Sequence, residues 1–389
     1  MSKTLNIGIV GYKFMGKAHS NAYVKAPRFF SLDRTLGLKV ACGRHQKSLK
    51  EFAETWGWED TETSWEQVIG RDDVDVVDIS SPTSTHKDMA IAAARAGKHV
   101  FCEKPMSLNA AEAREMYTAV KKAGVKHMIG FNYRCVPAVR LAKQLIDEGK
   151  IGDIFHWRGA YLQDWIVDPA FPLVWHLRKE VSGYGPHGDL GSHSVDLARY
   201  LVGEIKTVSC TMANFITERS LPDEEQEKAF EAASAEGTGK VTVEDASFMV
   251  VEFQNGALGS FEVSRFASGR RNFNSFEIYG SKGSLCFNLE RLNELEFYSR
   301  EDPSGTQGFK TILVTESTHP YVAAWWPPGH TIGYEHTFVH EVADFVRCIE
   351  DDTEAQPSFY DGLRSMEVLD AAAESAREGK RVEVPVGRP

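Results

Sequence analysis

The first 130 residues alternate short apolar runs with amphipathic stretches, and this alternation constrains the fold more than any other feature. Five strands are predicted, at residues 5–10, 38–42, 75–80, 99–102 and 126–131. Helices are predicted after the first four strands, at residues 17–24, 46–56, 86–96 and 110–123. Short apolar strands joined by helices of this length indicate a parallel sheet with right-handed crossovers. We therefore predict an α/β fold with a doubly wound Rossmann domain over residues 1–130.

The remainder of the chain, residues 131–389, has a different pattern. A strand is predicted at residues 154–162 and a helix at about 189–202, followed by segments in which apolar and polar residues alternate up to residue 300. Asn255-Gly256 and Ser281-Lys282-Gly283 provide hairpin turns between these segments. Two helices are predicted near the end, at residues 335–350 and 360–377, and the acidic stretch 221–243 is interpreted as a surface loop or short helix. We predict an α+β domain with a large open, mainly antiparallel sheet, which binds substrate.

An open sheet has a broad apolar face that commonly pairs with another subunit, so we expect a homodimer or homotetramer formed through this sheet. The net charge of −11, from 55 acidic and 44 basic residues, argues against a nucleic-acid or anionic-membrane partner. The six cysteines form no C-x-x-C pair, which favours reduced thiols. The chain enters a strand at once, and no apolar run approaches the roughly 18 residues of a membrane helix, so a cytoplasmic location is expected.

The first predicted strand leads into the turn Gly11-Tyr12-Lys13-Phe14-Met15-Gly16, a variant of the glycine-rich turn that binds dinucleotides. Gly11 permits the tight turn, and Gly16 lets the following helix pack on the strand. The helix N-terminus offers free N–H groups to a pyrophosphate. Lys13 stands where the middle glycine is expected. Its side chain either contacts the phosphates, or it points to solvent and the backbone tolerates the angles that the turn requires.

The end of the second predicted strand bears on the choice of nucleotide. Sites specific for NAD usually carry an acidic residue there, on the ribose hydroxyls. Gly43 occupies that position and is followed by the cations Arg44 and Lys47. Because a missing acid beside cations suits a 2′-phosphate, we predict NAD(P) with a preference for NADP. The alternative is that Arg44 stacks on the adenine and NAD is used.

Three further stretches lie at predicted strand ends or at a helix start: SSPTSTH at 80–86, CEKPMS at 102–107 and GDLGSHSVDLARYLVG at 188–203. Ligands bind at the carboxyl ends of strands in doubly wound sheets. With the glycine-rich turn, these stretches resemble the Gfo/Idh/MocA family, which includes glucose–fructose oxidoreductase, inositol 2-dehydrogenases and other sugar dehydrogenases. The resemblance covers almost the whole chain. Lys13 departs from the family's usual glycine, which affects the pyrophosphate contact and not the fold.

The resemblance implies that Lys104, Asp189 and His193 form the catalytic set of an NAD(P)-dependent oxidoreductase acting on CH–OH groups. A histidine, with an ordinary pKa of about 6.5, can accept the hydroxyl proton as a secondary alcohol is oxidised, so His193 is the expected general base. Lys104 would stabilise the developing alkoxide. Asp189, four residues before His193, would bind a second hydroxyl or orient the imidazole. Asp196 is either a support for His193 or a helix-packing residue.

The predicted cofactor-binding set is drawn from the turn and the strand ends: Gly11, Lys13, Phe14, Met15, Gly16, Gly43, Arg44, Ser81, Pro82, His86, Glu103 and Lys104. His86 and His187 have the alternative of being ordinary polar neighbours. No His/Cys cluster has the spacing of a zinc site, so no metal is predicted.

Sugars bind by stacking a ring face on an aromatic side chain while polar side chains take the hydroxyls. The predicted substrate-binding set is Asn132, Tyr133, Arg134, Asp164, Trp165, Trp175, Arg178, Asp189 and His193. The alternative is that the tryptophans are core and the charged residues ordinary surface. Trp325 and Trp326 would cover the pocket or lie in a subunit contact.

Within the family, the loop APRFFSLDRTLGLKV and the segment YLQDW look most like levoglucosan-dehydrogenase-type enzymes, which oxidise an anhydrosugar or glycoside hydroxyl. A cyclitol such as myo-inositol fits as well. Two other functions share this fold: a glycoside hydrolase that retains its NAD, and a non-catalytic sensor of nucleotides or sugars. The presence of Lys104 and His193 weighs against the sensor.

Overall fold

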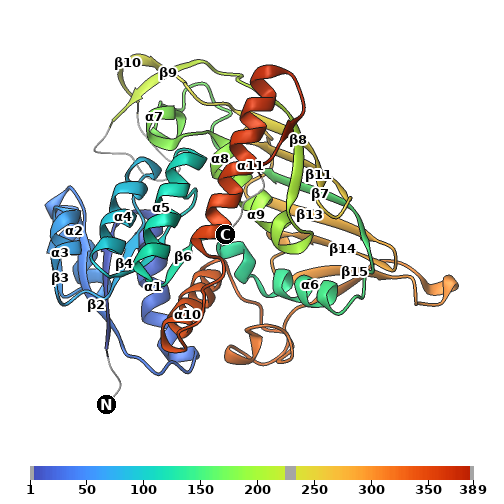
Figure 1. Ribbon diagram of the computed structural model, residues 1–389, viewed down its shortest axis with the longest axis horizontal. Helices are drawn as coiled ribbons and strands as arrows, with labels where there is room; N and C mark the ends of the chain where they lie inside the picture. The colour runs from blue at the N-terminus through green and yellow to red at the C-terminus, as the bar shows by residue number, and fades with distance from the viewer. Residues whose placement is uncertain (1–3, 224–233, 386–389) are drawn as a thin grey trace. The chain divides into compact units, whose positions relative to one another are not determined.

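The computed structural model describes residues 4–223 and 234–385 and separates into two compact units (Figure 1). The first comprises residues 1–132 and 334–366, and the second comprises residues 133–333 and 367–389. The Rossmann unit therefore contains a segment, 334–366, that the sequence pattern placed in the second domain. The reason is packing: helix α10 (Glu335–Glu350) lies along helix α1 (Phe14–Phe29), more than 300 residues earlier in the chain.

The first unit is built on a six-stranded sheet in the order β3-β2-β1-β4-β5-β6, in which every pairing is parallel. Its strands are β1 (Leu5–Val10), β2 (Leu36–Cys42), β3 (Asp60–Glu62), β4 (Val76–Ile79), β5 (His99–Cys102) and β6 (His127–Ile129). Strand order reverses between β1 and β4, so the ends of these two strands form the switch point where doubly wound sheets bind ligands. The predicted Rossmann fold is confirmed.

The remaining helices of this unit are α2 (Gln46–Trp56), α3 (Trp65–Gly70), α4 (His86–Arg95), α5 (Ala110–Ala123) and the first part of α11 (Phe359–Glu378). Local chemistry sets the ends of α5. The Asn109 side chain accepts a hydrogen bond from the Glu112 N–H at 3.0 Å, and the Glu112 carboxylate accepts one from the Leu108 N–H at 3.1 Å. The helix stops at Gly124, which has φ +67°. These end signals explain why the predicted bounds of α5 are correct.

The second unit is built on a nine-stranded sheet in the order β16-β15-β14-β13-β7-β12-β11-β8-β17. Its strands are β7 (Ile154–Leu162), β8 (Ile205–Ala213), β11 (Ala246–Phe253), β12 (Leu258–Ser264), β13 (Phe273–Gly280), β14 (Gly283–Asn288), β15 (Glu294–Ser299), β16 (Lys310–Leu313) and β17 (Val382–Glu383). All pairings are antiparallel except β7–β12 at the centre, which is parallel. The prediction of a large, mainly antiparallel sheet is confirmed.

One prediction in this unit is partly wrong. The stretch 221–243, expected to be a loop or short helix, includes strand β10 (Ser234–Lys240), which pairs with β9 (Glu218–Pro222) in a separate two-stranded sheet. Its middle part, residues 224–233, lies outside the described residues. The helices of this unit are α6 (Pro137–Asp147), α7 (Lys179–Ser182), α8 (Pro186–Asp189), α9 (Gly191–Leu201) and the end of α11.

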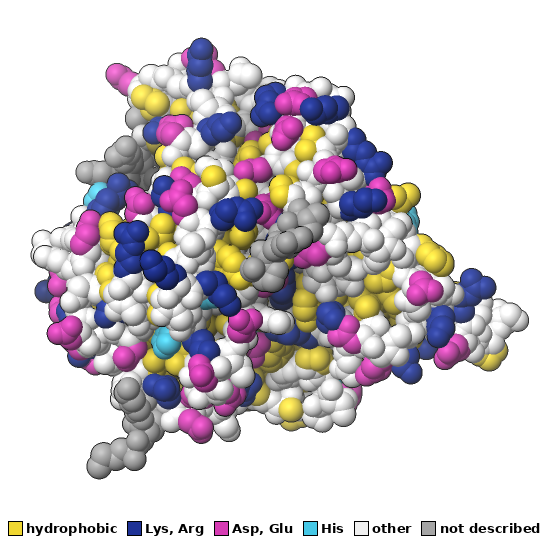
Figure 2. Space-filling model, in the orientation of Figure 1, with side chains coloured by type: hydrophobic (Ala, Val, Ile, Leu, Met, Phe, Trp, Pro, Cys, Tyr) yellow, Lys and Arg dark blue, Asp and Glu magenta, His cyan; other side chains and the backbone are white. Residues whose placement is uncertain are grey.

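Helices α8 and α9 pack on strands β7, β11 and β12, and this covered face of the sheet is apolar. Trp157, 1% exposed, stacks on Phe276 with ring centroids 5.3 Å apart. Elsewhere the described surface carries a mixture of charges: on the face seen in Figure 2, basic and acidic side chains are interspersed. Such mixing is typical of solvated surface.

Candidate active site

The turn after β1 depends on two glycines. Gly11 has φ +113°, and a Cβ there would lie 2.4 Å from the carbonyl oxygen of Ser80. A Cβ on Gly16 would lie 2.2 Å from the carbonyl oxygen of Gly11. Both distances are below any real contact, so the turn, the end of β4 and helix α1 approach as closely as they do only because side chains are absent. This is the geometry that a pyrophosphate-binding turn requires.

Lys13 lies between these glycines with φ −76°, outside the positive-φ region that favours glycine. Lys13 is exposed immediately before α1, whose first residue, Phe14, is 41% exposed and stacks on Tyr334 at 6.4 Å between ring centroids. The contact of Lys13, Phe14 or Met15 with phosphate or nicotinamide stays a prediction.

Gly43, at the end of β2, lies directly beneath the ring of Tyr12. A Cβ on Gly43 would be 2.2 Å from Tyr12 Cδ1 and 2.3 Å from Cε1. The Tyr12 ring thus fills the space in which an acidic side chain would begin. Burial raises the pKa of Tyr12, while the charge of Arg44 and a hydrogen bond with Ser48 lower it.

The ends of β4 and β5 are tied to one another by His86. Its ring is 1% exposed and lies between two carbonyl oxygens, that of Ser81 at 2.8 Å from Nε2 and that of Pro105 at 3.1 Å from Nδ1. Burial lowers the pKa of His86, which favours the neutral ring. His86 was predicted either to bind the cofactor or to be an ordinary polar neighbour; its two carbonyl contacts link the strand ends, and a contact with the cofactor stays a prediction.

Lys104 follows β5 and is partly exposed, whereas Glu103 and Pro105 on either side of it are buried. The Lys104 N–H donates to Glu103 Oε2 at 3.1 Å. The backbone of Lys104 is therefore held in place by its neighbours.

In the second unit, His193 lies on α9 and is packed against two tyrosines. Its ring centroid is 4.4 Å from that of Tyr133 and 6.0 Å from that of Tyr161, and all three side chains are at most 4% exposed. The two tyrosine hydroxyls are 2.9 Å apart. Aromatic contact on this scale fixes the orientation of the imidazole.

A chain of hydrogen bonds leads away from these tyrosines. Tyr161 donates to Asn272 Oδ1 at 2.8 Å, and Gln163 Nε2 donates to the same oxygen at 3.0 Å. Trp165 Nε1 donates in turn to Gln163 Oε1 at 2.8 Å. The segment YLQDW thus presents alternate residues, 161, 163 and 165, to one connected polar network.

Asp189 ends α8 and pairs with Arg265, whose guanidinium is fully buried and lies 5.0 Å from the ring of Trp165. We expected Asp189 and His193 on one helix; instead α8 ends at Asp189 and α9 begins at Gly191. Leu190 between them keeps right-handed helical angles, φ −93° and ψ −43°, so the chain continues almost without a break.

Two predicted substrate ligands are engaged elsewhere. Arg134 is buried and donates two hydrogen bonds to Asp196, at 2.7 and 2.5 Å. Asn132 is buried and donates to Thr337 Oγ1 at 2.9 Å. Each of these polar residues near a strand end faces a buried partner here, and a contact with substrate stays a prediction. Asp196 is a packing partner, one of its two predicted roles.

The other predicted residues are less confined. Asp164 accepts from Arg271 at 3.1 Å and from the Gly269 N–H at 2.9 Å, which fixes the loop after β12. Trp165 packs on Phe171 and on an apolar cluster that includes Ile166 and Leu173. Trp175 and Arg178 are partly exposed.

Sequence reasoning missed four residues of this network: Tyr161, Gln163, Arg265 and Asn272. Tyr161 and Gln163 stand in the quoted segment YLQDW, where the period of two along a strand groups them with Trp165. Nothing local marks Arg265 or Asn272.

Among residues 4–223 and 234–385, no group of three or more His, Cys, Asp or Glu side chains is arranged to hold a metal ion. None of the described helices is both long enough and apolar enough to span a membrane.

Two family models match the chain. Residues 5–131 match the oxidoreductase family with an NAD-binding Rossmann fold, and residues 139–286 match the GFO/IDH/MocA C-terminal domain. The chain belongs to the Gfo/Idh/MocA family of oxidoreductases. The predicted family and the enzyme class, a nicotinamide-dependent oxidoreductase, are therefore confirmed.

Relatives within the Gfo/Idh/MocA family are named sugar and cyclitol dehydrogenases. Levoglucosan dehydrogenase of Pseudarthrobacter phenanthrenivorans is 42% identical, over 98% of this chain and 99% of the relative. Inositol 2-dehydrogenase of Rhizobium meliloti is 26% identical, over 98% and 99%. A solved structure of levoglucosan dehydrogenase in complex with NADH and levoglucosan superposes with a TM-score of 0.93 at 41% identity, covering 98% of this chain and 100% of that one.

Proposed function

We propose that this protein is a dehydrogenase that oxidises a secondary hydroxyl of a sugar, anhydrosugar, glycoside or cyclitol to a ketone. The observation that carries the proposal is the packing of His193 against Tyr133 and Tyr161, in a chain 42% identical to a levoglucosan dehydrogenase. An anhydrosugar is the first substrate to test, and an inositol is the second.

The turn after β1 fits a dinucleotide. Because Gly11 and Gly16 carry no Cβ, backbone atoms occupy the positions where those Cβ atoms would lie, and the turn packs tightly enough to bind a pyrophosphate. A bound nicotinamide ring supplies the hydride acceptor. His193 takes the hydroxyl proton onto its imidazole as the substrate C–H bond breaks. Lys104 donates a hydrogen bond to the oxygen that gains charge. Asp189, kept ionised by Arg265, accepts a hydrogen bond from a neighbouring hydroxyl and so orients the substrate.

The preference between NAD and NADP has support on both sides. Gly43 and Arg44 favour acceptance of a 2′-phosphate, as the sequence predicted, whereas the solved relative contains NADH. Affinities for NAD⁺ and NADP⁺, measured with wild-type protein and with Arg44→Ala, decide between them. If Arg44→Ala loses affinity for NADP⁺ alone, Arg44 contacts the 2′-phosphate. If the variant loses affinity for both dinucleotides equally, Arg44 stacks on the adenine.

The test of the activity is the appearance of reduced nicotinamide with a panel of levoglucosan, glucosides, glucose, xylose and inositols. We expect turnover with one class, and a loss of about 10²–10⁴-fold in kcat for both Lys104→Ala and His193→Asn. Release of an aglycone without net reduction of nicotinamide would identify the retained-cofactor hydrolase. Tight nicotinamide binding with no reaction would identify the sensor.

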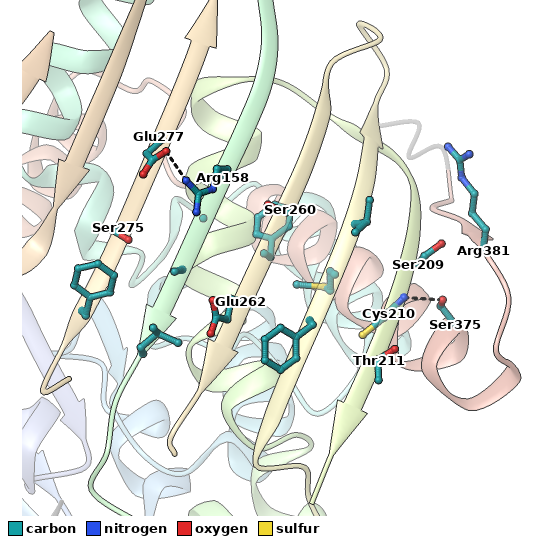
Figure 3. A pocket seen from close by; sticks show the side chains of 18 of the residues that line it. Arg158, Ser209, Cys210, Thr211, Ser260, Glu262, Ser275, Glu277, Ser375 and Arg381 are labelled. Atoms are coloured by element: carbon teal, nitrogen blue, oxygen red, sulfur yellow. Dashed lines mark hydrogen bonds and ion pairs between the residues drawn. The ribbon is translucent and has the colours of Figure 1, made fainter. Parts of the chain in front are cut away.

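We also propose that the open face of the nine-stranded sheet is a contact between copies of this chain. Figure 3 shows this face, where Arg158, Ser260 and Glu262 point away from the helices behind the sheet. It combines exposed apolar side chains, Phe248 at 48% and Val250 at 62%, with an Arg158–Glu277 ion pair at 2.9 Å. Apolar area together with charges of both signs is compatible with a two-fold contact between identical surfaces.

A further inference from the structure

A buried cluster of ionisable side chains lies in the Rossmann unit, next to Lys104. His19 of α1, Asp78 of β4, Glu103 after β5 and Glu341 of α10 are all at most 3% exposed. His19 Nδ1 lies 2.7 Å from Asp78 Oδ2, and His19 Nε2 lies 3.0 Å from Glu103 Oε1. One imidazole therefore bridges the ends of two neighbouring strands.

The geometry fixes the charge on His19. An ionised carboxylate only accepts hydrogen bonds, so an imidazole with a carboxylate at each nitrogen needs a proton on both. Asp78 also accepts hydrogen bonds from the hydroxyls of Tyr23 and Ser80, each at 2.7 Å, as expected of the ionised form. Burial alone would lower the pKa of His19, but attraction to Asp78 and hydrogen bonds to both carboxylates outweigh it and raise that pKa well above its ordinary value.

The other titratable groups around the ring are consistent with a cationic His19. Neither carboxyl oxygen of Glu341 has a hydrogen-bond partner, and burial, with the charge of Glu103, raises its pKa well above the ordinary value although the charge of His19 opposes this. Burial likewise raises the pKa values of Tyr23 and Cys102. The two carboxyl partners of the ring and the raised pKa of His19 together indicate that its imidazole is protonated.

The same cluster holds the backbone of Lys104. Glu103 uses Oε1 for His19 and Oε2 for the Lys104 N–H, at 3.1 Å. Residue 130 leaves room for this carboxylate only because it is glycine, since a Cβ there would lie 2.5 Å from Oε1. On the other side of Lys104, the Pro105 carbonyl oxygen lies 3.1 Å from His86.

We propose that His19 is a positioning residue for Lys104: its imidazolium, clamped between Asp78 and Glu103, holds the Glu103-Lys104-Pro105 turn in place. The proposal rests on the role of Lys104 proposed above. It assigns a function to a fully buried residue of helix α1. It also links α1, which carries the glycine-rich turn, to the lysine at the end of β5.

A purely structural ion pair would stabilise the fold without acting on Lys104, and two variants separate the alternatives. His19→Gln removes the cation and keeps one amide donor. Tyr23→Phe is the matched control, because it removes a hydrogen bond from the same Asp78 carboxylate but leaves the link between His19 and Glu103 intact.

We expect His19→Gln to lower kcat by about 10–100-fold while KM changes by less than about threefold, and Tyr23→Phe to keep kcat within about threefold. Amide hydrogen exchange of the 102–106 peptide should accelerate in His19→Gln and not in Tyr23→Phe. Nitrogen-15 spectra of labelled histidine, assigned by comparison with His19→Gln, should show both His19 nitrogens protonated at pH 8. Glu103→Gln, with the same expected fall in kcat, replaces His19→Gln if that variant does not fold.

A neutral His19 at pH 8 would overturn the clamp. So would equal effects of His19→Gln and Tyr23→Phe on kcat and on exchange. If the wild-type protein oxidises no substrate, or if Lys104→Ala keeps full activity, the proposed function fails instead. In that case the nitrogen-15 spectra of His19 and the hydrogen-exchange rates of residues 102–106 still test whether His19 holds the Glu103-Lys104-Pro105 turn, because neither measurement depends on activity.

Discussion

Arg265, in the loop after β12, places its fully buried guanidinium against the carboxylate of Asp189 at the end of α8, 76 residues earlier in the chain. The Asp189 side chain is 29% exposed, so the pair has one face toward solvent and one in the core. The ring of Trp165, 5.0 Å from the guanidinium, covers the cation further. A buried arginine in this arrangement keeps Asp189 ionised and limits its rotation.

Replacing either member of this pair should therefore affect stability and substrate binding together. Asp189→Asn leaves the Arg265 cation buried without that anion, and we expect a loss of about 1–3 kcal/mol in the free energy of unfolding. Arg265→Gln should raise KM by about tenfold or more, with a smaller effect on kcat. Urea unfolding and steady-state kinetics provide both numbers. An Arg265→Gln enzyme with unchanged KM would show that Asp189 needs no partner to bind substrate.

A second close contact, between Tyr12 and Gly43, predicts an effect at the nucleotide end. A methyl group at residue 43 would displace the Tyr12 ring, so Gly43→Ala should cost about 1–3 kcal/mol in stability and weaken dinucleotide binding. The effect should shrink to a few tenths of a kcal/mol in a Tyr12→Ala background, because the two side chains then no longer collide. The test is to measure unfolding and equilibrium dinucleotide binding for the wild-type protein, the two single variants and the double variant. If Gly43→Ala lowers the stability equally with and without the Tyr12 ring, the prediction is contradicted.

The fold was predictable where the chain carries local signals. Helices α2, α5 and α10 have the bounds that the sequence pattern predicted, and Asn255-Gly256 forms its hairpin with Gly256 at φ +88°. Strand β3 and helix α3 were missed because three and six residues are too few to establish a period. The parallel pairing of β7 with β12 joins segments about 100 residues apart, and no local pattern specifies it.

The residues of the candidate site also differ in whether the sequence could predict them. Gly11 and Gly16 were predictable because a turn of this shape tolerates no side chain at either position. The pairing of Arg134 with Asp196 was not predictable, because residue type alone does not reveal a buried partner. The contacts of His19 with Asp78 and Glu103 span 59 and 84 residues, so only the folded chain brings them together.

Glu244 predicts a dependence of stability on pH. It accepts a hydrogen bond from the His187 N–H at 2.9 Å, and burial raises its pKa from 4.5 to about 7. The folded state therefore holds this proton more tightly than the unfolded state, and stability is lost as pH rises from about 4.5 to about 7. His187 has the opposite effect, because burial lowers its pKa to about 4 and stability rises with pH between about 4 and 6.5.

Glu244→Gln isolates the first of these two titrations. The variant keeps an oxygen for the His187 N–H and cannot ionise, so at pH 8 it should be more stable than the wild-type protein by about 1–3 kcal/mol. The difference in stability between the two proteins should vanish near pH 4, where Glu244 in the wild-type protein is protonated and therefore as neutral as the glutamine of the variant. Urea unfolding from pH 4 to 8 is the measurement, and the contribution of His187 cancels in the comparison. A difference that does not change with pH would mean that Glu244 does not titrate in this range.

The open face of the nine-stranded sheet leads to a prediction about assembly. Val250, 62% exposed on β11, lies opposite Ser260 of β12, two residue pairs from Glu262. A glutamate in place of Val250 would add a further negative charge to this face, beside Glu262 and Glu277, and remove apolar area from the proposed contact. We expect Val250→Glu to weaken association by at least about tenfold, equivalent to about 1.4 kcal/mol.

Phe309→Glu, at an apolar residue 48% exposed between β15 and β16, is the matched control and should leave the assembly intact. Light scattering across a dilution series reports the mass of each protein. A wild-type monomer, or equal dissociation of both variants, would mean that this face is not the subunit contact.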